Sequence, residues 1–321
     1  MKVIYLTETE KHIRDVYGTE EKVYCKADVI GEPTLFADTE YIFTTWDMPE
    51  FTEDEIRKYL PSLKAVFYGA GSVRYFAYPF LKCGVKVFSA WAANAVPVAE
   101  YTVAQIILAN KGFYGASRLM KSGLYEKGRD YCIAHGGNYA KKIGILGAGM
   151  IGKLVINMLK GYKLSVMVFD PFLSDDDARA LGVEKCSLER VFSECGVVSC
   201  HLANNDATKG MLGKALFERL PSYATFINTG RGAQVVEGEL IDVLKKRKDL
   251  TALLDVTFPE PPEKSSEFYM LENCVLTPHI AGSLANETRR MGEYIVEEYE
   301  RFIKNEPTKY EVSLKMLETM A

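Results

Sequence analysis

One glycine-rich segment constrains the fold more than any other part of this sequence: Gly147-Ala148-Gly149-Met150-Ile151-Gly152. It follows the apolar run 143–146 and opens the segment 150–160, in which apolar residues recur at helical spacing. Glycines at a strand-to-helix turn permit a tight bend and let a ligand approach the backbone, and the free N–H groups of a helix N-terminus favour phosphate. The motif therefore predicts a dinucleotide-binding turn in a doubly wound α/β sheet.

An acidic residue supports this interpretation and narrows the ligand. Asp170 ends the next apolar run, where a carboxylate can accept hydrogen bonds from the ribose hydroxyls of an adenosine. Pro171 and Phe172 follow it in place of an arginine, and a carboxylate would repel the 2′-phosphate of NADP. Glycine-rich turns also arise for packing reasons alone, so the prediction depends on the turn together with Asp170. NAD is the expected cofactor.

The chain is long enough for two domains, and its apolar runs fall into two series. The first hundred residues alternate short strands with helices, which favours a small, mostly parallel sheet, and its runs are 3–6, 41–44, 65–68 and 85–88. The second series begins near Lys142, and its runs are 143–146, 166–170, 197–202, 225–229, 252–256 and 274–277. We predict an α/β protein with a Rossmann dinucleotide-binding domain over 102–286 and a smaller flavodoxin-like substrate domain, discontinuous in sequence, over 1–101 and 287–321.

Composition excludes several classes of protein. The formal net charge is −4, whereas nucleic-acid and membrane-surface binding usually needs basic patches. The seven cysteines are irregularly spaced and include no Cys-x-x-Cys, so neither a disulfide framework nor a metal site is expected. The N-terminus reads as a first strand, and no run approaches the roughly 18 consecutive apolar residues of a membrane span. We expect a cytoplasmic protein without nucleic-acid or membrane partners.

Three side chains suited to alcohol oxidation follow the last three apolar runs. They are Arg231, Glu260 and His279, and open α/β sheets bind their ligands at such strand ends. Removing a hydride from a secondary alcohol requires a base for the hydroxyl proton, which histidine can supply. A neighbouring carboxylate would orient the imidazole, and an arginine can clamp a substrate carboxylate. Taken singly, each residue also fits an ordinary structural or surface role, so it is their shared position that favours an active site.

Four motifs follow one another along the chain. They are the glycine turn, Ile-Asn-Thr-Gly-Arg-Gly at 227–232, Asp-Val-x-x-x-Glu-Pro at 255–261 and Thr-Pro-His-Ile-Ala-Gly at 277–282. In this order they resemble the D-isomer-specific 2-hydroxyacid dehydrogenase family. Upstream, Val-Ala-Glu-Tyr-Thr at 98–102 is similar to the segment at that family's domain junction, and 64–71 is similar to its substrate loop. The resemblance covers nearly the whole chain.

The resemblance implies a role for each site residue. His279 corresponds to the acid/base, Glu260 to its paired carboxylate and Arg231 to the residue that binds the substrate carboxylate and carbonyl. Substrate contacts are implied for the backbone of the substrate loop and for two side chains, namely Ala70, Gly71, Ser72, Arg231 and His279. Cofactor contacts are implied for Gly147, Gly149, Met150, Ile151, Gly152, Asp170, His201, Leu202, Ala203, Thr208, Thr229, Gly230, Arg231, Asp255, His279 and Thr102. The resemblance further implies a site between the domains and no metal.

The expected reaction interconverts a small 2-hydroxy acid, of D configuration, and its 2-keto acid with NAD(H). Two segments depart from the family pattern, 72–75 after the substrate loop and 90–94 before the predicted junction helix, which leaves the side-chain preference open. Two alternatives also stay open: a formate or phosphite dehydrogenase-like enzyme, and an NAD(H)-sensing, corepressor-like regulatory protein. The resemblance also implies a homodimer, with the helix over 98–110 and its successor as the contact surface.

Overall fold

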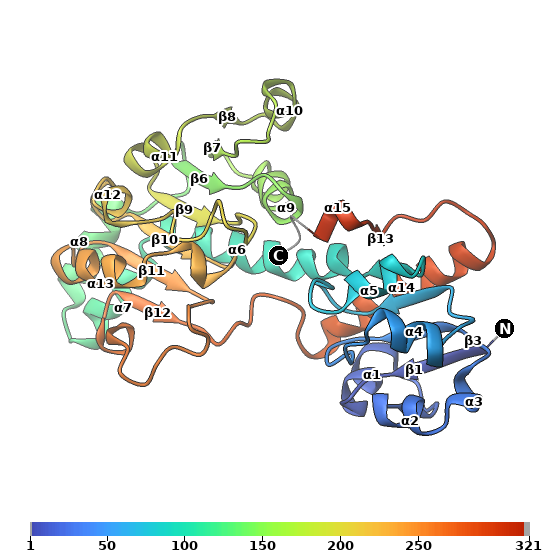
Figure 1. Cartoon of the computed structure of the whole chain (residues 1–321). Helices are drawn as coiled ribbons and strands as arrows, with labels where there is room; N and C mark the ends of the chain where they lie inside the picture. Colours follow the sequence, from blue (N-terminus) through green and yellow to red (C-terminus); the bar gives the residue numbers. More distant parts are fainter. Residues whose placement is uncertain (1, 318–321) are drawn as a thin grey trace. The chain divides into compact units, whose positions relative to one another are not determined.

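The computed structural model describes residues 2–317, which form two compact α/β units (Figure 1). One unit contains the chain up to Ala95 together with the part from Ser283 onward, drawn blue and red, and the other runs from Val96 to Gly282. The first unit is therefore discontinuous in sequence. The two crossings lie a few residues before the boundaries predicted at 101/102 and 286/287, and the first of them falls within a single long helix, α6 (Trp91–Asn110).

The discontinuous unit is built on a six-stranded sheet in the order β13-β5-β4-β3-β1-β2. Its parallel strands are β1 (Lys2–Leu6), β2 (Val23–Tyr24), β3 (Thr39–Thr44), β4 (Ala65–Tyr68) and β5 (Lys86–Ser89), and β13 (Glu311–Val312) joins antiparallel to β5. Its helices are α1 (Glu10–Tyr17), α2 (Lys26–Gly31), α3 (Pro33–Phe36), α4 (Glu53–Tyr59), α5 (Ala77–Lys82), η3 (Ala285–Glu287), α14 (Thr288–Ile303) and α15 (Leu314–Leu317). Each of the four strands predicted here is present.

Aromatic side chains dominate the packing of this unit on the face that α14 covers. Phe67 of β4 stacks on Phe88 of β5 with ring centroids 4.9 Å apart, and Tyr299 of α14 meets Phe67 edge-on at 5.3 Å. Ile295 and Met291, one and two turns before Tyr299 on α14, are fully buried against the same strands. Met291, Ile295 and Tyr299 recur every four residues, which keeps them on one face of the helix.

The second unit contains a seven-stranded, wholly parallel sheet in the order β12-β11-β10-β9-β6-β7-β8 (Figure 1). Its strands are β6 (Lys142–Leu146), β7 (Ser165–Phe169), β8 (Glu184–Lys185), β9 (Val197–Cys200), β10 (Thr225–Asn228), β11 (Thr251–Leu254) and β12 (Cys274–Leu276). Its helices after α6 are α7 (Phe113–Lys121), α8 (Tyr125–His135), α9 (Met150–Leu159), α10 (Asp175–Leu181), α11 (Leu188–Glu194), α12 (Lys214–Phe217), η1 (Gly232–Gln234), α13 (Glu237–Lys246) and η2 (Glu267–Met270). The predicted doubly wound architecture is confirmed.

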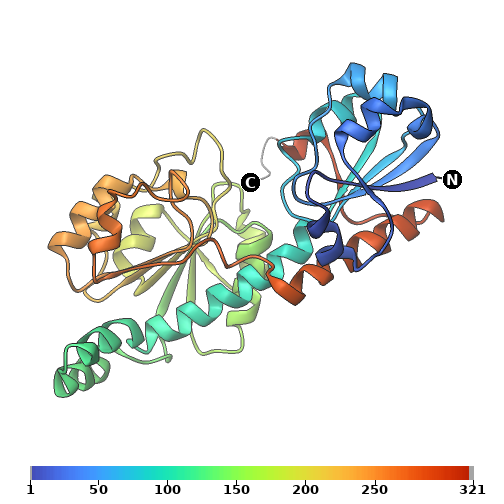
Figure 2. The same cartoon turned by 90° about the horizontal axis from the view of Figure 1, so that it is seen from below.

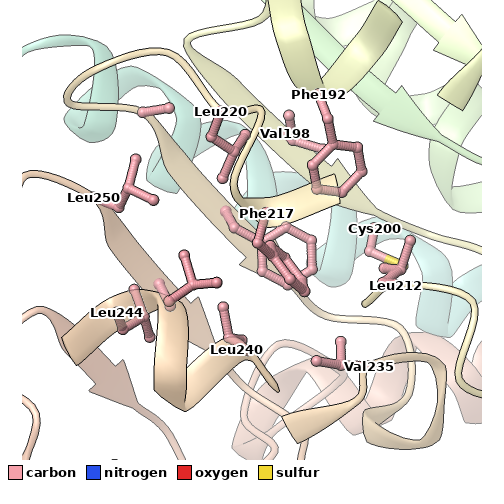
Figure 3. Packing of buried hydrophobic residues seen from close by; sticks show 14 of the residues in the cluster. Phe192, Val198, Cys200, Leu212, Phe217, Leu220, Val235, Leu240, Leu244 and Leu250 are labelled. Atoms are coloured by element: carbon pink, nitrogen blue, oxygen red, sulfur yellow. The ribbon is translucent and has the colours of Figure 1, made fainter. Parts of the chain in front are cut away.

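The order of these strands reverses at β6, which lies between β7 and β9 although it is the first of them in the chain. Such a reversal opens a crevice at the carboxyl end of the sheet, where α/β proteins bind nucleotides. The central strands β9, β10 and β11 are buried at every position, as their unalternating apolar sequences predict. On one face Phe217 packs edge-on against Phe192 (Figure 3). Phe217 also packs edge-on against Phe226. This core holds rigidly the loops that leave the strands.

Helix α6 is both long and apolar. Among residues 2–317 it is the one helix of sufficient length and mean hydropathy to match a membrane span, a test that core helices of proteins outside membranes also pass. Its side chains at Ala93, Ala99, Thr102 and Ile106 are completely buried, so α6 is a core helix of this protein.

Candidate active site

The glycine turn between β6 and α9 has the geometry that its sequence predicts. Gly147 has φ of +92°, and a Cβ there would lie 2.7 Å from the carbonyl oxygen of His201. A Cβ on Gly152 would lie 2.0 Å from the carbonyl oxygen of Gly147, so the start of α9 packs directly on the turn. A Cβ on Gly149 would meet nothing within 4 Å. Gly147 and Gly152 therefore allow close backbone packing within the turn. The space at Gly149 is open, on the side where a pyrophosphate would approach the helix N-terminus.

Asp170, directly after β7, fastens this turn. Its Oδ2 accepts a hydrogen bond from the N–H of Ala148 at 2.7 Å, and its Oδ1 accepts one from the N–H of Phe172 at 2.8 Å. Each carboxylate oxygen has a second lone pair, so Asp170 can also accept hydrogen bonds from ribose hydroxyls. The side chain therefore both shapes the glycine turn and offers the acceptor that an adenosine ribose needs.

The loop after β9 borders the same turn and carries a polar atom without a partner. His201 Nε2 lies 3.0 Å from Ser199 Oγ, while its Nδ1 is buried and makes no hydrogen bond within residues 2–317. Burial lowers the pKa of His201 to about 4, so the imidazole is neutral at pH 7. Further along the loop, Thr208 Oγ1 donates to the carbonyl of Ala203 at 2.6 Å. The open helix end, the free capacity of Asp170 and this unpaired nitrogen fit a bound dinucleotide.

The three residues predicted to react with substrate follow three adjacent strands. The register pairs Asn228 of β10 with Leu254 of β11, and Leu254 with Leu276 of β12, so the strands end side by side. The loops after them also pack on one another, because a Cβ on Gly232 would lie 2.0 Å from the carbonyl carbon of Thr257. In addition, Glu237 Oε1 accepts a hydrogen bond from the N–H of Phe258 at 2.8 Å. The loops that carry Arg231, Glu260 and His279 therefore share one edge of the sheet.

Arg231 is held by its own loop. Asn228 Oδ1 accepts the N–H of Gly230 at 3.0 Å, and Asn228 Nδ2 donates to the carbonyl of Arg231 at 3.0 Å. The guanidinium donates from Nη1 to the carbonyl of Gly230 at 2.8 Å. Burial lowers the pKa of Arg231, and the negative charge of Glu260 offsets part of this effect. The guanidinium remains charged and keeps unused donors for an anionic ligand.

His279 and Glu260 form a hydrogen-bonded pair. His279 Nδ1 lies 2.5 Å from Glu260 Oε1, and the two side chains are 46% and 40% exposed. When Nδ1 carries the proton it donates to the carboxylate, which leaves Nε2 to exchange a proton with a ligand. The exposure of both side chains means that such a ligand can reach the ring. This arrangement can perform acid–base catalysis.

A buried carboxylate supports the loop that presents His279. His279 has φ of +53°, a left-handed conformation that non-glycine residues adopt only when their surroundings hold them in it. Asp255, 3% exposed, accepts hydrogen bonds at Oδ1 from Thr277 Oγ1 (2.6 Å) and the N–H of Ile280 (2.8 Å), and at Oδ2 from the N–H of Ala281 (2.9 Å). The resemblance placed Asp255 beside the cofactor, which stays a prediction; the structure shows it bracing the histidine loop.

Thr102, predicted to touch the cofactor from the junction helix, is fully buried. Its Oγ1 lies 3.3 Å from Thr229 Oγ1, and the neighbouring Tyr101 hydroxyl lies 3.2 Å from Thr277 Oγ1. Through these two contacts, helix α6 supports the loops after β10 and β12. The predicted cofactor contact of Thr102 stays a prediction.

The predicted substrate loop lies in the other unit, at the carboxyl end of β4. Ser89 Oγ, at the end of the neighbouring strand β5, donates to the carbonyls of Ala70 and Gly71 and so holds the loop in place. In the described chain, residues 2–317, the N–H groups of Gly71 and Ser72 donate no hydrogen bond. Asn94 Nδ2 is directed at the same loop, 3.5 Å from where a Cβ on Gly71 would lie, while its Oδ1 accepts the N–H of Ser283 at 2.9 Å. This edge offers donors suited to a carboxylate.

Residues 103–281 match the profile described as the D-isomer specific 2-hydroxyacid dehydrogenase, NAD binding domain. This match extends over more than half of the chain. The chain belongs to the D-isomer-specific 2-hydroxyacid dehydrogenase family. The family predicted from the motifs is thereby confirmed, and so is the cofactor, because the matched domain is the family's NAD-binding domain.

Two named relatives each share 30% sequence identity with this chain. A D-3-phosphoglycerate dehydrogenase of Archaeoglobus fulgidus is 30% identical over 235 residues, which are 73% of this chain and 44% of that protein. A glyoxylate reductase of Korarchaeum cryptofilum is 30% identical over 227 residues, 70% of this chain and 68% of its own length. This chain spans about half the length, or less, of several phosphoglycerate dehydrogenases that it matches.

Among solved structures, a phosphoglycerate oxidoreductase from Rhizobium etli superposes with a TM-score of 0.80 at 19% identity, covering 98% of this chain and 99% of that one. That structure therefore has the same fold as this chain over nearly its whole length.

Sequence patterns did not reveal four residues that shape the site: Asn94, Asn228, Glu237 and Gln234. Asn94, Glu237 and Gln234 bond to backbone groups of other loops, whereas Asn228 bonds to two backbone groups of its own loop. The one available signal is Asn228, because an Asn at the end of a strand often turns the following backbone through its own side chain.

Proposed function

We propose that this chain interconverts a small D-2-hydroxy acid and its 2-keto acid by hydride transfer to or from NAD. The observation that carries the proposal is the 2.5 Å hydrogen bond between His279 Nδ1 and Glu260 Oε1, on the sheet edge that also carries Arg231. Bound NAD supplies the acceptor for the hydride. Proton transfer and substrate orientation are left to the side chains of the protein.

His279 takes the hydroxyl proton of the substrate at Nε2 during oxidation, while the two electrons of the carbon–hydrogen bond leave as hydride. Glu260 accepts the hydrogen bond from Nδ1 and stabilises the imidazolium that results. In reduction the same proton returns from Nε2 to the carbonyl oxygen. Arg231 holds the substrate carboxylate through paired N–H donors and polarises the adjacent carbonyl. The unused N–H groups of Gly71 and Ser72 support the prediction that their loop also binds a carboxylate.

A substrate panel tests this proposal. NADH oxidation should be followed at fixed enzyme concentration with glyoxylate, pyruvate, hydroxypyruvate, and branched and aromatic 2-keto acids, and NAD reduction with 3-phosphoglycerate, since named relatives include a glyoxylate reductase and D-3-phosphoglycerate dehydrogenases. We expect turnover with at least one 2-keto acid, and with the D but not the L form of the matching hydroxy acid. Absence of turnover across the panel, in a preparation that binds NADH, would contradict the proposal.

We also propose that the protein is a homodimer. The helical pair α7–α8 stands at the end of α6 (Figure 2) and exposes large apolar side chains, namely Phe113, Met120, Leu124, Tyr125 and Ile133. An apolar surface of this kind is typical of a protein–protein contact. Sedimentation of the wild type should show a dimer, and Ile133→Glu should shift it toward monomer. A wild-type monomer at micromolar concentration would contradict the proposal.

A further inference from the structure

Gln234 connects two parts of the site that have separate predicted roles. It ends η1, the short helical turn directly after Arg231, and its side chain is completely buried. A buried primary amide is costly unless its donors and acceptor are used, so its partners reveal what it holds.

The donor end of this amide holds the loop after β9. Gln234 Nε2 donates to the carbonyl of Leu202 at 2.5 Å and to the carbonyl of Ala203 at 3.1 Å. Both carbonyls belong to the loop that borders the glycine turn and carries the unpaired His201 nitrogen.

The acceptor end holds Arg231. Gln234 Oε1 accepts the backbone N–H of Arg231 at 3.4 Å and the thiol of Cys200 at 3.2 Å. Reversing the amide would direct its N–H groups at other donors and its oxygen at two carbonyl oxygens, so the orientation is set by the partners. The backbone at Gln234 is itself fixed, because its carbonyl accepts the N–H of Leu212 at 2.9 Å.

We propose that Gln234 is a positioning residue that couples cofactor binding to substrate binding. The planar amide joins the carbonyls of Leu202 and Ala203 to the backbone of Arg231, so a shift of the cofactor loop is passed to the residue that clamps the substrate. Coupling of this kind requires one element that contacts both binding sites, and the hydrogen bonds of the Gln234 amide to the two loops supply that connection. The inference rests on the proposed function and adds to it the route by which bound NADH prepares the carboxylate site.

The test measures coupling rather than turnover. Oxamate, an unreactive analogue of a 2-keto acid, is titrated into the protein with and without saturating NADH, and the ratio of the two affinities reports the coupling. Gln234→Met keeps a similar volume and removes every hydrogen bond of the amide. Asn273→Leu is the matched control. Asn273 is 2% exposed and donates from Nδ2 to the carbonyls of Leu244, Arg247 and Leu250, but it lies just before β12, at the opposite end of the strands.

We expect NADH to strengthen oxamate binding in the wild type and Gln234→Met to reduce that enhancement about ten-fold, a change within the usual range of coupling between sites. Asn273→Leu should lower the melting temperature and keep the wild-type ratio. A wild-type ratio in Gln234→Met would overturn the inference while leaving the proposed function intact. If Gln234→Met does not fold, Gln234→Glu, which keeps the shape and the acceptor but not the donors, is measured instead; failure of both to fold would overturn a positioning role. A wild type that binds NADH but neither binds oxamate nor turns over any 2-keto acid would overturn both proposals.

Discussion

The carboxyl ends of the two sheets carry different kinds of loop. In the NAD-binding unit, polar side chains fasten three loops of the site: the partly buried Asp170 the glycine turn, the buried Asn228 and Gln234 the Arg231 loop, and the buried Asp255 the His279 loop. In the discontinuous unit, the loop after β4 is held in place by Ser89, while the N–H groups of Gly71 and Ser72 are unused within the described part of the chain. The loops at the edge of the NAD-binding unit are held in place by side-chain hydrogen bonds, whereas the loop after β4 in the discontinuous unit has N–H groups that can bind a ligand.

The contrast predicts where substitutions change catalysis and where they change substrate affinity. Removing a group that acts on the reacting atoms should cost most, removing a brace should cost less, and changing the substrate loop should act mainly on KM.

Arg231→Ala should reduce kcat/KM for the best 2-keto acid by about a thousand-fold, since a charged, bidentate hydrogen bond to the substrate would be lost. The affinity for NADH, measured by fluorescence titration, should change little, because the glycine turn and Asp170 are untouched. Arg231→Lys should recover only part of the loss, because a lysine cannot present the planar pair of donors. Equal losses in NADH affinity and in kcat/KM would remove the distinction between the two roles.

Asp255→Asn should lower the free energy of unfolding by about 3 kcal/mol, since a buried carboxylate that accepts three hydrogen bonds becomes an amide with one acceptor oxygen. The loop would then hold His279 less firmly in its left-handed conformation, and turnover should fall as well. Urea unfolding and steady-state kinetics measure both effects. Unchanged stability would contradict the bracing role.

His201 has a buried ring nitrogen, Nδ1, without a hydrogen-bond partner in the described residues. The stability of the protein should therefore depend on pH through the protonation of this imidazole. Its pKa is lowered to about 4 in the folded protein, below the ordinary value of 6.5, so the unfolded chain binds more protons between these values. The contribution of neutral His201 to the free energy of unfolding is therefore complete above pH 6.5 and is lost as the pH falls toward 4. The free energy of unfolding should fall by roughly 2 kcal/mol between pH 7 and pH 5. Urea unfolding across this range should show a smaller loss in His201→Gln. Identical pH profiles for the two proteins would rule out His201 as the cause.

Asn94→Ala tests the substrate edge. Its amide reaches toward the Gly71 loop and accepts the N–H of Ser283, so its loss should raise KM for the 2-keto acid about five-fold, with a smaller change in kcat. NADH affinity should stay the same. A fall in kcat without a change in KM would assign Asn94 to the chemistry and blur the contrast between the two edges.

Much of the fold could be predicted because long apolar runs are unambiguous in sequence. The six runs assigned to the second sheet all form strands, and the turn before α9 lies where its glycines indicate. The strands β2, β8 and β13 were not predicted, since each has only two residues and two residues show no periodicity. Their pairing is set by the neighbouring strand and not by their own composition.

The candidate site was predicted only in part, for a related reason. Arg231, Glu260 and His279 could be identified because each follows a strand end and has a distinctive side chain. The positioning groups could not be identified, because the partners of Gln234 and Asn94 are backbone atoms of other loops. Asp255 could be identified by its motif, but the hydrogen bonds that brace residues 277–281 depend on a loop conformation that sequence does not show.

The most direct test of the account compares NADH affinity with turnover in His279→Ala. We expect an NADH dissociation constant close to that of the wild type and a turnover number lower by about three orders of magnitude, because a general acid–base group is removed. A variant that binds NADH and turns over substrate at the wild-type rate would contradict the claim that the His279–Glu260 pair carries the proton.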